Sequence, residues 1–198
     1  MYLQDDLTNT LVIEKSRFIC YMKHVKSEEE YRDYLNEIRK KHYDATHVCS
    51  ALVCHNVQRS SDDGEPAGTA GSPILNVLVR NDLDETCALV VRYFGGIKLG
   101  AGGLIRAYGN SVSRCLENAV LLEDVEYGRY RLVLDYESAN KIDHFLRNST
   151  IDLQTEYDVD VTYTFAIGSG DILNRISEFT KGKKPEYIGK QMIPTVVK

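Results

Sequence analysis

The sequence predicts an α+β protein of two domains, an N-terminal mixed domain over residues 1–124 and a ferredoxin-like domain over residues 128–198. Three observations support this fold class. Segments that alternate apolar and polar residues are interleaved with segments of helical periodicity along the whole chain. Residues 123–127 carry a charge cluster without apolar periodicity, which predicts a linker. The segments after it follow the order strand, helix, strand, strand, helix, strand, which is typical of the ferredoxin-like fold.

The first part of the chain predicts two strands and a helix. Residues 10–13 and 17–25 alternate apolar and polar side chains on either side of Lys15-Ser16. Ser27 is followed by three glutamates, and this pattern is typical of a helix start. The hydroxyl can accept a hydrogen bond from a free amide of the first turn, and the carboxylates favour the positive end of the helix dipole.

Residues 45–54 predict a further strand, on which His47 and Cys49 share one face. These two residues and the pair Cys54-His55 invite a metal-site interpretation. A structural role is the favoured alternative, because no second ligand pair with the spacing of known metal sites is present. The five cysteines are an odd number without a CxxC motif, which indicates reduced, mostly buried thiols rather than a disulfide framework.

The middle of the chain predicts a loop, a helix, a central strand and a second helix. Residues 56–70 are rich in turn formers, and Ser72-Pro73 is typical of a cap followed by the first residue of a helix. A nearly continuous apolar run at residues 86–94 predicts a strand that is covered on both faces. The expected helices cover residues 74–80 and about 104–121. In the second domain, strands are expected at 129–135, 151–157, 160–166 and 187–196, and helices at 138–146 and 171–180.

Nine of the 14 glycines lie between Gly64 and Gly109. The order strand, glycine-rich turn, helix predicts an anion site, because free amides and the positive end of the helix dipole converge at a helix start. The alternative is a purely structural role, in which a pair of tight turns only joins strands to helices. The glycine spacing matches neither nucleotide-binding fingerprint, so no cofactor is predicted. The residues expected to bind nucleic acid or another anion are Arg92, Gly95, Gly96, Lys98, Gly100, Gly102, Gly103 and Arg106.

An acidic loop with Asp62, Asp63 and Glu65 is the second candidate feature. These carboxylates lack the spaced oxygen ligands of a calcium loop, and no metal is predicted. Two interpretations remain open. The carboxylates could act in general acid–base chemistry or hold magnesium. Alternatively, they could cap the turn or a helix and pair with Arg92 or Arg106; this loop-supporting role is the one we favour.

Charge and hydropathy exclude several classes of protein. The net charge of −5 argues against a nucleic-acid binder that works by bulk charge, so any such contact must come from a local patch. No segment approaches the roughly 20 apolar residues that span a membrane. The N-terminal residues lack the basic and apolar regions of a signal peptide. We therefore expect a soluble, cytoplasmic protein with no membrane partner.

The sequence resembles the IMPACT (YigZ-like) family over about residues 11–121. The second domain looks like the small C-terminal domain of the bacterial, two-domain members. The motifs that carry the resemblance are Asp62-Asp63-Gly64-Glu65-Pro66, Gly68-Thr69-Ala70-Gly71 with Pro73, Val91-Arg92-Tyr93-Phe94-Gly95-Gly96, Leu99-Gly100 with residues 103–108, Ser16-Arg17-Phe18, and His47-x-Cys49-x-Ala51.

The resemblance implies a fold and a class of function. It implies an N-terminal α+β domain like that of certain ribosomal proteins and small-molecule kinases. It also implies a C-terminal domain similar to the last domain of ribosomal translocase factors. Eukaryotic members of the family regulate translation by restraining a starvation-responsive kinase of an initiation factor. For bacterial members the resemblance implies nucleic acid or the ribosome as partner, and it carries over no catalytic residue.

Three functional hypotheses follow. The first is a non-enzymatic, translation-associated regulatory protein that binds RNA or the ribosome through the glycine-rich basic turn. The second is an enzyme acting on a phosphorylated small molecule, with Asp62 or Asp63 as base or magnesium ligand. The third is a protein-interaction module whose two loops form a docking face. The oligomeric state is left open.

Overall fold

The computed structural model describes residues 1–197 and divides the chain into two compact units. Unit 1 holds residues 1–123 together with Val196 and Val197, and unit 2 holds Asp124–Thr195. The described residues form a mixed α+β structure with two five-stranded sheets and five α-helices.

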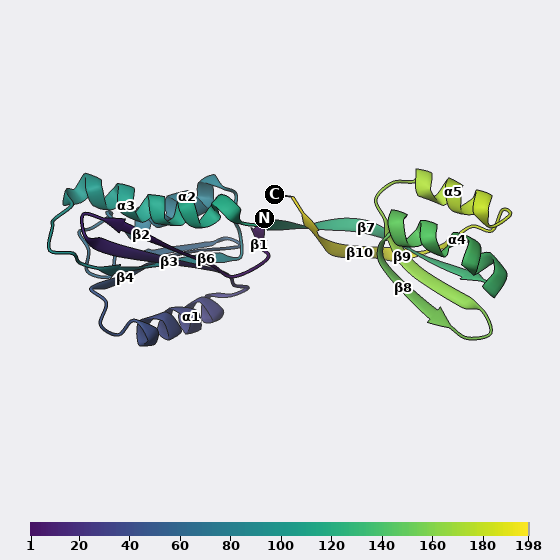
Figure 1. Ribbon diagram of the computed structural model, residues 1–198, viewed down its shortest axis with the longest axis horizontal. Coiled ribbons are helices and arrows are strands. Elements are labelled where there is room, and N and C mark those ends of the chain that lie inside the picture. Colours follow the sequence, from purple (N-terminus) through teal and green to yellow (C-terminus); the bar gives the residue numbers. More distant parts are fainter. Residues whose placement is uncertain (198) are drawn as a thin grey trace. The chain divides into compact units, whose positions relative to one another are not determined.

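Unit 1 is a sheet with helices on both faces (Figure 1). Its strand order is β2-β3-β6-β4-β5, and neighbouring strands are antiparallel. Helix α1 covers one face, while α2 and α3 cover the other. The elements are β1 (Tyr2–Leu3), β2 (Leu7–Ile13), β3 (Ser16–His24), α1 (Glu28–Lys41), β4 (His47–Cys54), β5 (Val57–Ser61), α2 (Gly71–Arg80), β6 (Thr86–Tyr93), α3 (Gly100–Cys115) and a 3₁₀ turn at Leu116–Asn118.

The central strand β6 determines which side chains reach each face of the sheet. Its apolar run is buried on both sides, as the sequence predicted. Ala88 and Val90 contribute to the core under α2 and α3, while Leu89 and Val91 contribute to the core under α1. Because successive strand residues point to opposite faces, Arg92 lies on the same face as Ala88 and Val90. The sequence therefore sends this arginine toward α3.

Unit 2 has its helices on one face of its sheet (Figure 1). The strand order is β8-β9-β7-β10, and β1 pairs with the first residues of β7 inside unit 1. A single core lies between these strands and helices α4 and α5. The elements are β7 (Leu121–Leu134), α4 (Tyr136–Ser149), β8 (Ile151–Tyr157), β9 (Val161–Ile167), α5 (Asp171–Phe179) and β10 (Glu186–Val196).

The division between the two units falls within the predicted linker at residues 123–127, after Glu123, but this segment is not irregular, because it belongs to the continuous strand β7. The charged side chains of this segment are exposed, so they keep their hydration when the strand forms. One of them, Glu126, forms an ion pair of 2.6 Å with Lys190 on β10. An opposite-charge pair between strands stabilises the ladder instead of breaking it. The predicted loop at residues 56–70 is also shorter than expected, since Val57–Ser61 forms the edge strand β5.

Three helix starts differ from the prediction. Helix α2 begins at Gly71, and no side chain of its own caps it, so Ser72 is not the cap. Helix α4 begins after Asp135, whose carboxylate accepts from the Ser138 amide; Ser138 was the predicted cap. Helix α3 begins at Gly100 and ends at Cys115, earlier at both ends than predicted.

Candidate functional site

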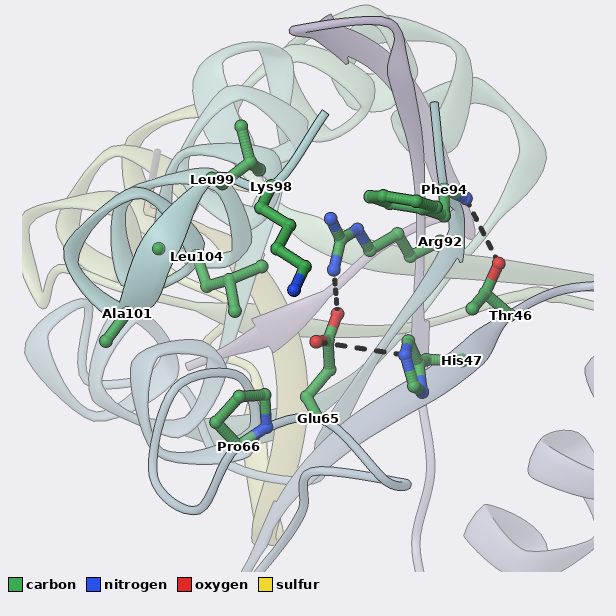
Figure 2. Close-up of a pocket in the computed structure, with 11 residues that line it drawn as sticks. Thr46, His47, Glu65, Pro66, Arg92, Phe94, Lys98, Leu99, Ala101 and Leu104 are labelled. Atoms are coloured by element: carbon green, nitrogen blue, oxygen red, sulfur yellow. Dashed lines mark hydrogen bonds and ion pairs between the residues drawn. The ribbon is translucent and has the colours of Figure 1, made fainter. Parts of the chain in front are cut away.

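A pocket of about 460 Å³ lies in unit 1 where β4, β6, the acidic loop and the start of α3 meet (Figure 2). Each segment contributes side chains to its lining. His47 comes from β4 and Arg92 from β6, while Glu65 and Pro66 come from the acidic loop. Phe94, Lys98, Leu99, Gly100, Ala101 and Leu104 come from the glycine-rich turn and the first residues of α3. The pocket thus joins the two segments that the sequence singled out.

Strand pairing places the two polar residues of the pocket floor side by side. His47 and Arg92 are direct partners in the antiparallel pairing of β4 with β6. Side chains of directly opposed residues lie on the same face of a sheet. Both therefore project toward α3, as Figure 2 shows.

Glu65 is the carboxylate at the floor, and its side chain is only 3% exposed. Its Oε1 accepts hydrogen bonds from Arg92 Nη1 at 2.6 Å and from the Tyr108 hydroxyl at 2.7 Å. The Arg92 side chain is 6% exposed and also reaches the Ser16 hydroxyl at 3.4 Å. Burial raises the pKa of the Tyr108 hydroxyl, so this group remains a hydrogen-bond donor to Glu65. The buried charge pair is therefore held by hydrogen bonds from three elements.

The hydrogen bonds of His47 define its tautomer. Its Nδ1 lies 2.8 Å from the carbonyl oxygen of Asp63, which can only accept a hydrogen bond. Nδ1 must therefore carry the proton, and in the neutral ring Nε2 is an acceptor. Nε2 faces Glu65 Oε2 at 3.8 Å. In the neutral ring, two acceptor atoms of the protein thus face one another at the floor of the pocket, whereas in the protonated ring the same two atoms form an ion pair.

Asp62 and Asp63 hold the acidic loop in place. The Asp62 carboxylate accepts hydrogen bonds from the amides of Gly68, Ala70 and Gly71 at 2.8–3.0 Å. Burial acts to raise the pKa of Asp62, but these three donors outweigh it and hold the pKa below its ordinary value. The same contacts supply the start of α2 with an acceptor, which explains why Ser72 is not needed as a cap.

Asp63 ties the loop to two other elements. Its carboxylate pairs with Arg39 of α1 at 2.8 Å and accepts from the Val48 amide at 2.7 Å. Arg39 was not among the arginines that the sequence offered as partners. Neither Asp62 nor Asp63 lines this pocket.

The glycine-rich turn packs closely on the turn between β2 and β3. A Cβ atom on Gly95 would overlap the backbone of Lys15 and Ser16, so no other residue fits there without displacing that turn. The Gly95 amide donates to the Ser16 hydroxyl at 3.1 Å. Gly96 and Gly100 both have positive φ, at 86° and 68°, which glycine adopts without strain.

The start of α3 and Lys98 form the positive end of the pocket. No side chain caps this helix, and its first turn contains no acidic residue. Free amides and the helix dipole therefore favour an anion there. Lys98 is exposed, and in the described part of the chain it has no ion-pair partner. Its side chain points toward the Glu65–Arg92 pair in Figure 2.

The remaining predicted site residues lie around the pocket rather than in it. Gly102 and Gly103 fall within the first turns of α3. Arg106 is exposed one turn further along and lines two neighbouring surface hollows instead. The prediction of site residues did not include Phe94, Leu104 or Tyr108. Phe94 is 47% exposed, and its place at the end of an apolar strand beside two glycines was the available signal.

The structure adds three observations, on metals, cysteines and membranes. Among residues 1–197, no group of three or more histidine, cysteine, aspartate or glutamate side chains is arranged to hold a metal ion. All five cysteines are buried, and none of them forms a disulfide. No helix within the described residues is long and apolar enough to cross a membrane.

Comparison with known proteins defines the class to which this fold and site belong. The family model of the Impact N-terminal domain matches residues 14–116, which include every segment around the pocket. The chain therefore belongs to the IMPACT family, as its motifs predicted.

Individual relatives extend the similarity to both units. IMPACT family member YvyE of Bacillus subtilis is 44% identical over 180 residues, which cover 87% of this chain and 83% of that protein. IMPACT family member YigZ of Escherichia coli is 40% identical over 139 residues, or 68% of each chain. A crystal structure of a hypothetical protein superposes with a TM-score of 0.61 and 31% identity, covering 95% of both chains.

Proposed function

We propose that this protein is a cytoplasmic, translation-associated regulator that binds RNA or the ribosome through its glycine-rich basic turn. Membership of the IMPACT family supports the regulatory role, because the resemblance implies control of translation for members of this family. The carrying observation is structural. One short segment combines exposed cations, an exposed aromatic ring and free helix amides, and among the described residues neither Lys98 nor Arg106 forms an ion pair.

Each component has a role in binding RNA. Lys98, Arg106 and the amides at the start of α3 contact phosphates, which position a nucleic acid without reading its sequence. Phe94 and Ile97 are 47% and 39% exposed, and an exposed ring beside basic groups supports base stacking. The local character of the patch is compatible with the net charge of −5.

Arg92 has a positioning role in this proposal. Its guanidinium is buried against Glu65, so it does not contact a phosphate directly. It lies 5.5 Å from the centroid of the Phe94 ring, a distance at which a cation and an aromatic face attract. Glu65 therefore holds Arg92, and Arg92 in turn holds the ring that faces the RNA.

The proposal includes the two-domain division of the sequence. We assign residues 1–124 to the IMPACT-type domain with its ribosomal-protein-like or kinase-like α+β fold. We assign residues 128–198 to a ferredoxin-like domain. The strand order β10-β7-β9-β8 and the helices on one face support the second assignment.

Co-sedimentation of the full chain with ribosomes and with free RNA tests the proposal. Binding should weaken as salt rises from low to moderate concentration, because phosphate contacts release counterions. Arg106→Glu should reduce binding several-fold. Arg114→Glu, the same charge change two turns further along α3 and also exposed, is the matched control and should have little effect. Equal effects of the two variants, or salt-independent binding, would argue against the basic turn; no binding at any salt would favour a protein partner instead.

A further inference from the structure

The floor of the pocket contains polar atoms of buried side chains without a partner. Arg92 Nε is buried and makes no hydrogen bond. Glu65 Oε2 accepts none from the described residues and lies 3.8 Å from His47 Nε2, which is an acceptor in the neutral ring. Buried polar groups are nearly always paired, so the unpaired Arg92 Nε at the base of a cavity indicates a missing partner. Two facing acceptors call for a group that donates hydrogen bonds to both, such as an exocyclic amine, and the Arg92 Nε donor calls for an acceptor beside that amine, such as a ring nitrogen.

The opposite end of the pocket calls for an anion. The uncapped start of α3 is positive, and so is the exposed Lys98, which has no ion-pair partner among the described residues. A phosphate accepts several amide hydrogen bonds at once and gains from the dipole and the lysine. The ligand thus needs a donor at one end and an anionic group at the other.

Apolar side chains form the rest of the pocket lining. Phe94, Pro66 and Leu104 surround the Glu65–Arg92 pair and Lys98 (Figure 2). The volume of about 460 Å³ is within the range of small-molecule pockets. A flat ring system can stack on the exposed Phe94 ring, whereas inorganic phosphate would leave the walls and floor empty. An aliphatic carboxylate would leave the two acceptors unpaired.

We propose that this pocket binds a nucleoside monophosphate. The phosphate lies at the start of α3 beside Lys98, the base lies against Phe94, and an amino group of the base donates to Glu65 Oε2 and His47 Nε2. This inference rests on the proposed function, because it names the nucleotide that the RNA-binding turn would hold. Free nucleotide and the 5′-phosphorylated end of an RNA offer the same chemistry.

Calorimetric titration of the full chain with AMP, IMP, adenosine and inorganic phosphate tests the chemistry. AMP should bind best. IMP replaces the amine with a carbonyl facing two acceptors and should bind about tenfold more weakly, as should adenosine without its phosphate. Absence of AMP binding overturns the inference, as does inorganic phosphate binding as tightly as AMP.

A charge placed at the mouth of the pocket tests its location. Ala101→Glu puts a carboxylate in the first turn of α3, where it favours the helix but repels a phosphate. The variant should fold normally and lose AMP affinity by about tenfold or more. Ala67→Glu makes the same change at an exposed loop residue outside the pocket and should bind AMP like the wild type. Unchanged AMP affinity in Ala101→Glu would place the nucleotide elsewhere and refute the proposal.

Short RNAs distinguish the two sources of the nucleotide and separate this inference from the proposed function. If the pocket takes an RNA end, a 5′-phosphorylated hexanucleotide should compete with AMP and its 5′-hydroxyl counterpart should not. If it takes a free nucleotide, neither should compete. Ribosome binding that persists while AMP fails to bind refutes the pocket alone. AMP binding without any ribosome or RNA binding refutes the proposed function and leaves the pocket.

Discussion

Replacing Glu65 with glutamine would leave the Arg92 guanidinium buried without a counter-charge. The two side chains are 3% and 6% exposed, and their closest atoms are 2.6 Å apart. Removing one partner of a buried ion pair costs about 3–5 kcal/mol, because the remaining charge stays desolvated. Glutamine keeps an acceptor for the Tyr108 hydroxyl, so we expect the lower end, about 3 kcal/mol, for Glu65→Gln. Arg92→Met leaves the carboxylate unpaired and should cost at least as much.

The double variant Glu65→Gln/Arg92→Met removes both charges together. Its loss should be smaller than the sum of the single losses by about 2 kcal/mol, the coupling expected for groups in direct contact. Hydrogen exchange of β6 amides in native conditions, followed across low denaturant concentrations, measures the unfolding free energy of unit 1 itself. This readout is preferable to a global melt, because a chain of two units need not unfold in a single transition.

Additive losses would refute the reasoning. If the single effects sum to within about 0.5 kcal/mol of the double, the pair is not coupled and the charges are screened by water. Tyr108→Phe serves as a control for the hydrogen bond alone. It removes a donor to Glu65 without changing any charge and should cost about 1 kcal/mol.

Asp62→Ala removes the acceptor of three amides and should cost about 2 kcal/mol in urea unfolding. The pKa of Asp62 is lowered in the folded state, so the stabilisation by its carboxylate is complete above the ordinary pKa of 3.8 and is lost as the pH falls through the folded-state pKa. The unfolding free energies of the variant and the wild type should therefore differ less at low pH. Gly95→Ala should destabilise unit 1 by about 3 kcal/mol, because a methyl group would overlap the Lys15 backbone. Gly109→Ala should instead stabilise unit 1 by about 0.5–1 kcal/mol, because Gly109 lies within α3 and has open space around it. Thermal melts that fail to show these opposite signs would contradict the close packing at Gly95. Ser27→Ala should cost about 1 kcal/mol in the same assay through loss of the α1 cap, and an unchanged melting temperature would count against that cap.

Features set by neighbouring residues could be predicted from the sequence. The start of α1 is an example: Ser27 accepts from the Glu30 amide three residues later, as predicted. The alternation along β4 also placed residues on the correct faces, with Cys49 and Ala51 toward α2 and α3, and Val48 and Leu52 toward α1. Both depend on local geometry, which a few consecutive residues determine.

The true partners of the site could not be predicted, because they are distant along the chain. Arg92 and Glu65 are 27 residues apart, and the choice of Arg92 over Arg106 depends on the strand pairing that turns it toward the loop. The partner of Asp63 is Arg39, which lies on helix α1. Pairing of strands, rather than composition, decides these contacts.

The start of α3 was misplaced because glycine has a low helix propensity. Gly100, Gly102 and Gly103 weakened the expected helix, yet the helix begins among them. Close approach explains one of these positions: a Cβ on Gly103 would lie 2.9 Å from the Leu99 Cβ.

The acidic loop has a consequence for the order in which unit 1 assembles. Asp63 bonds to residues 15 and 24 positions away, and Glu65 to residues 27 and 43 positions away. Contacts of such separation form only after the intervening segments have been brought together. The loop should therefore become ordered last, once the sheet and the helices on both of its faces are in place. The exchange rate of the Val48 amide, which donates to Asp63, would then report that folding of this unit is complete.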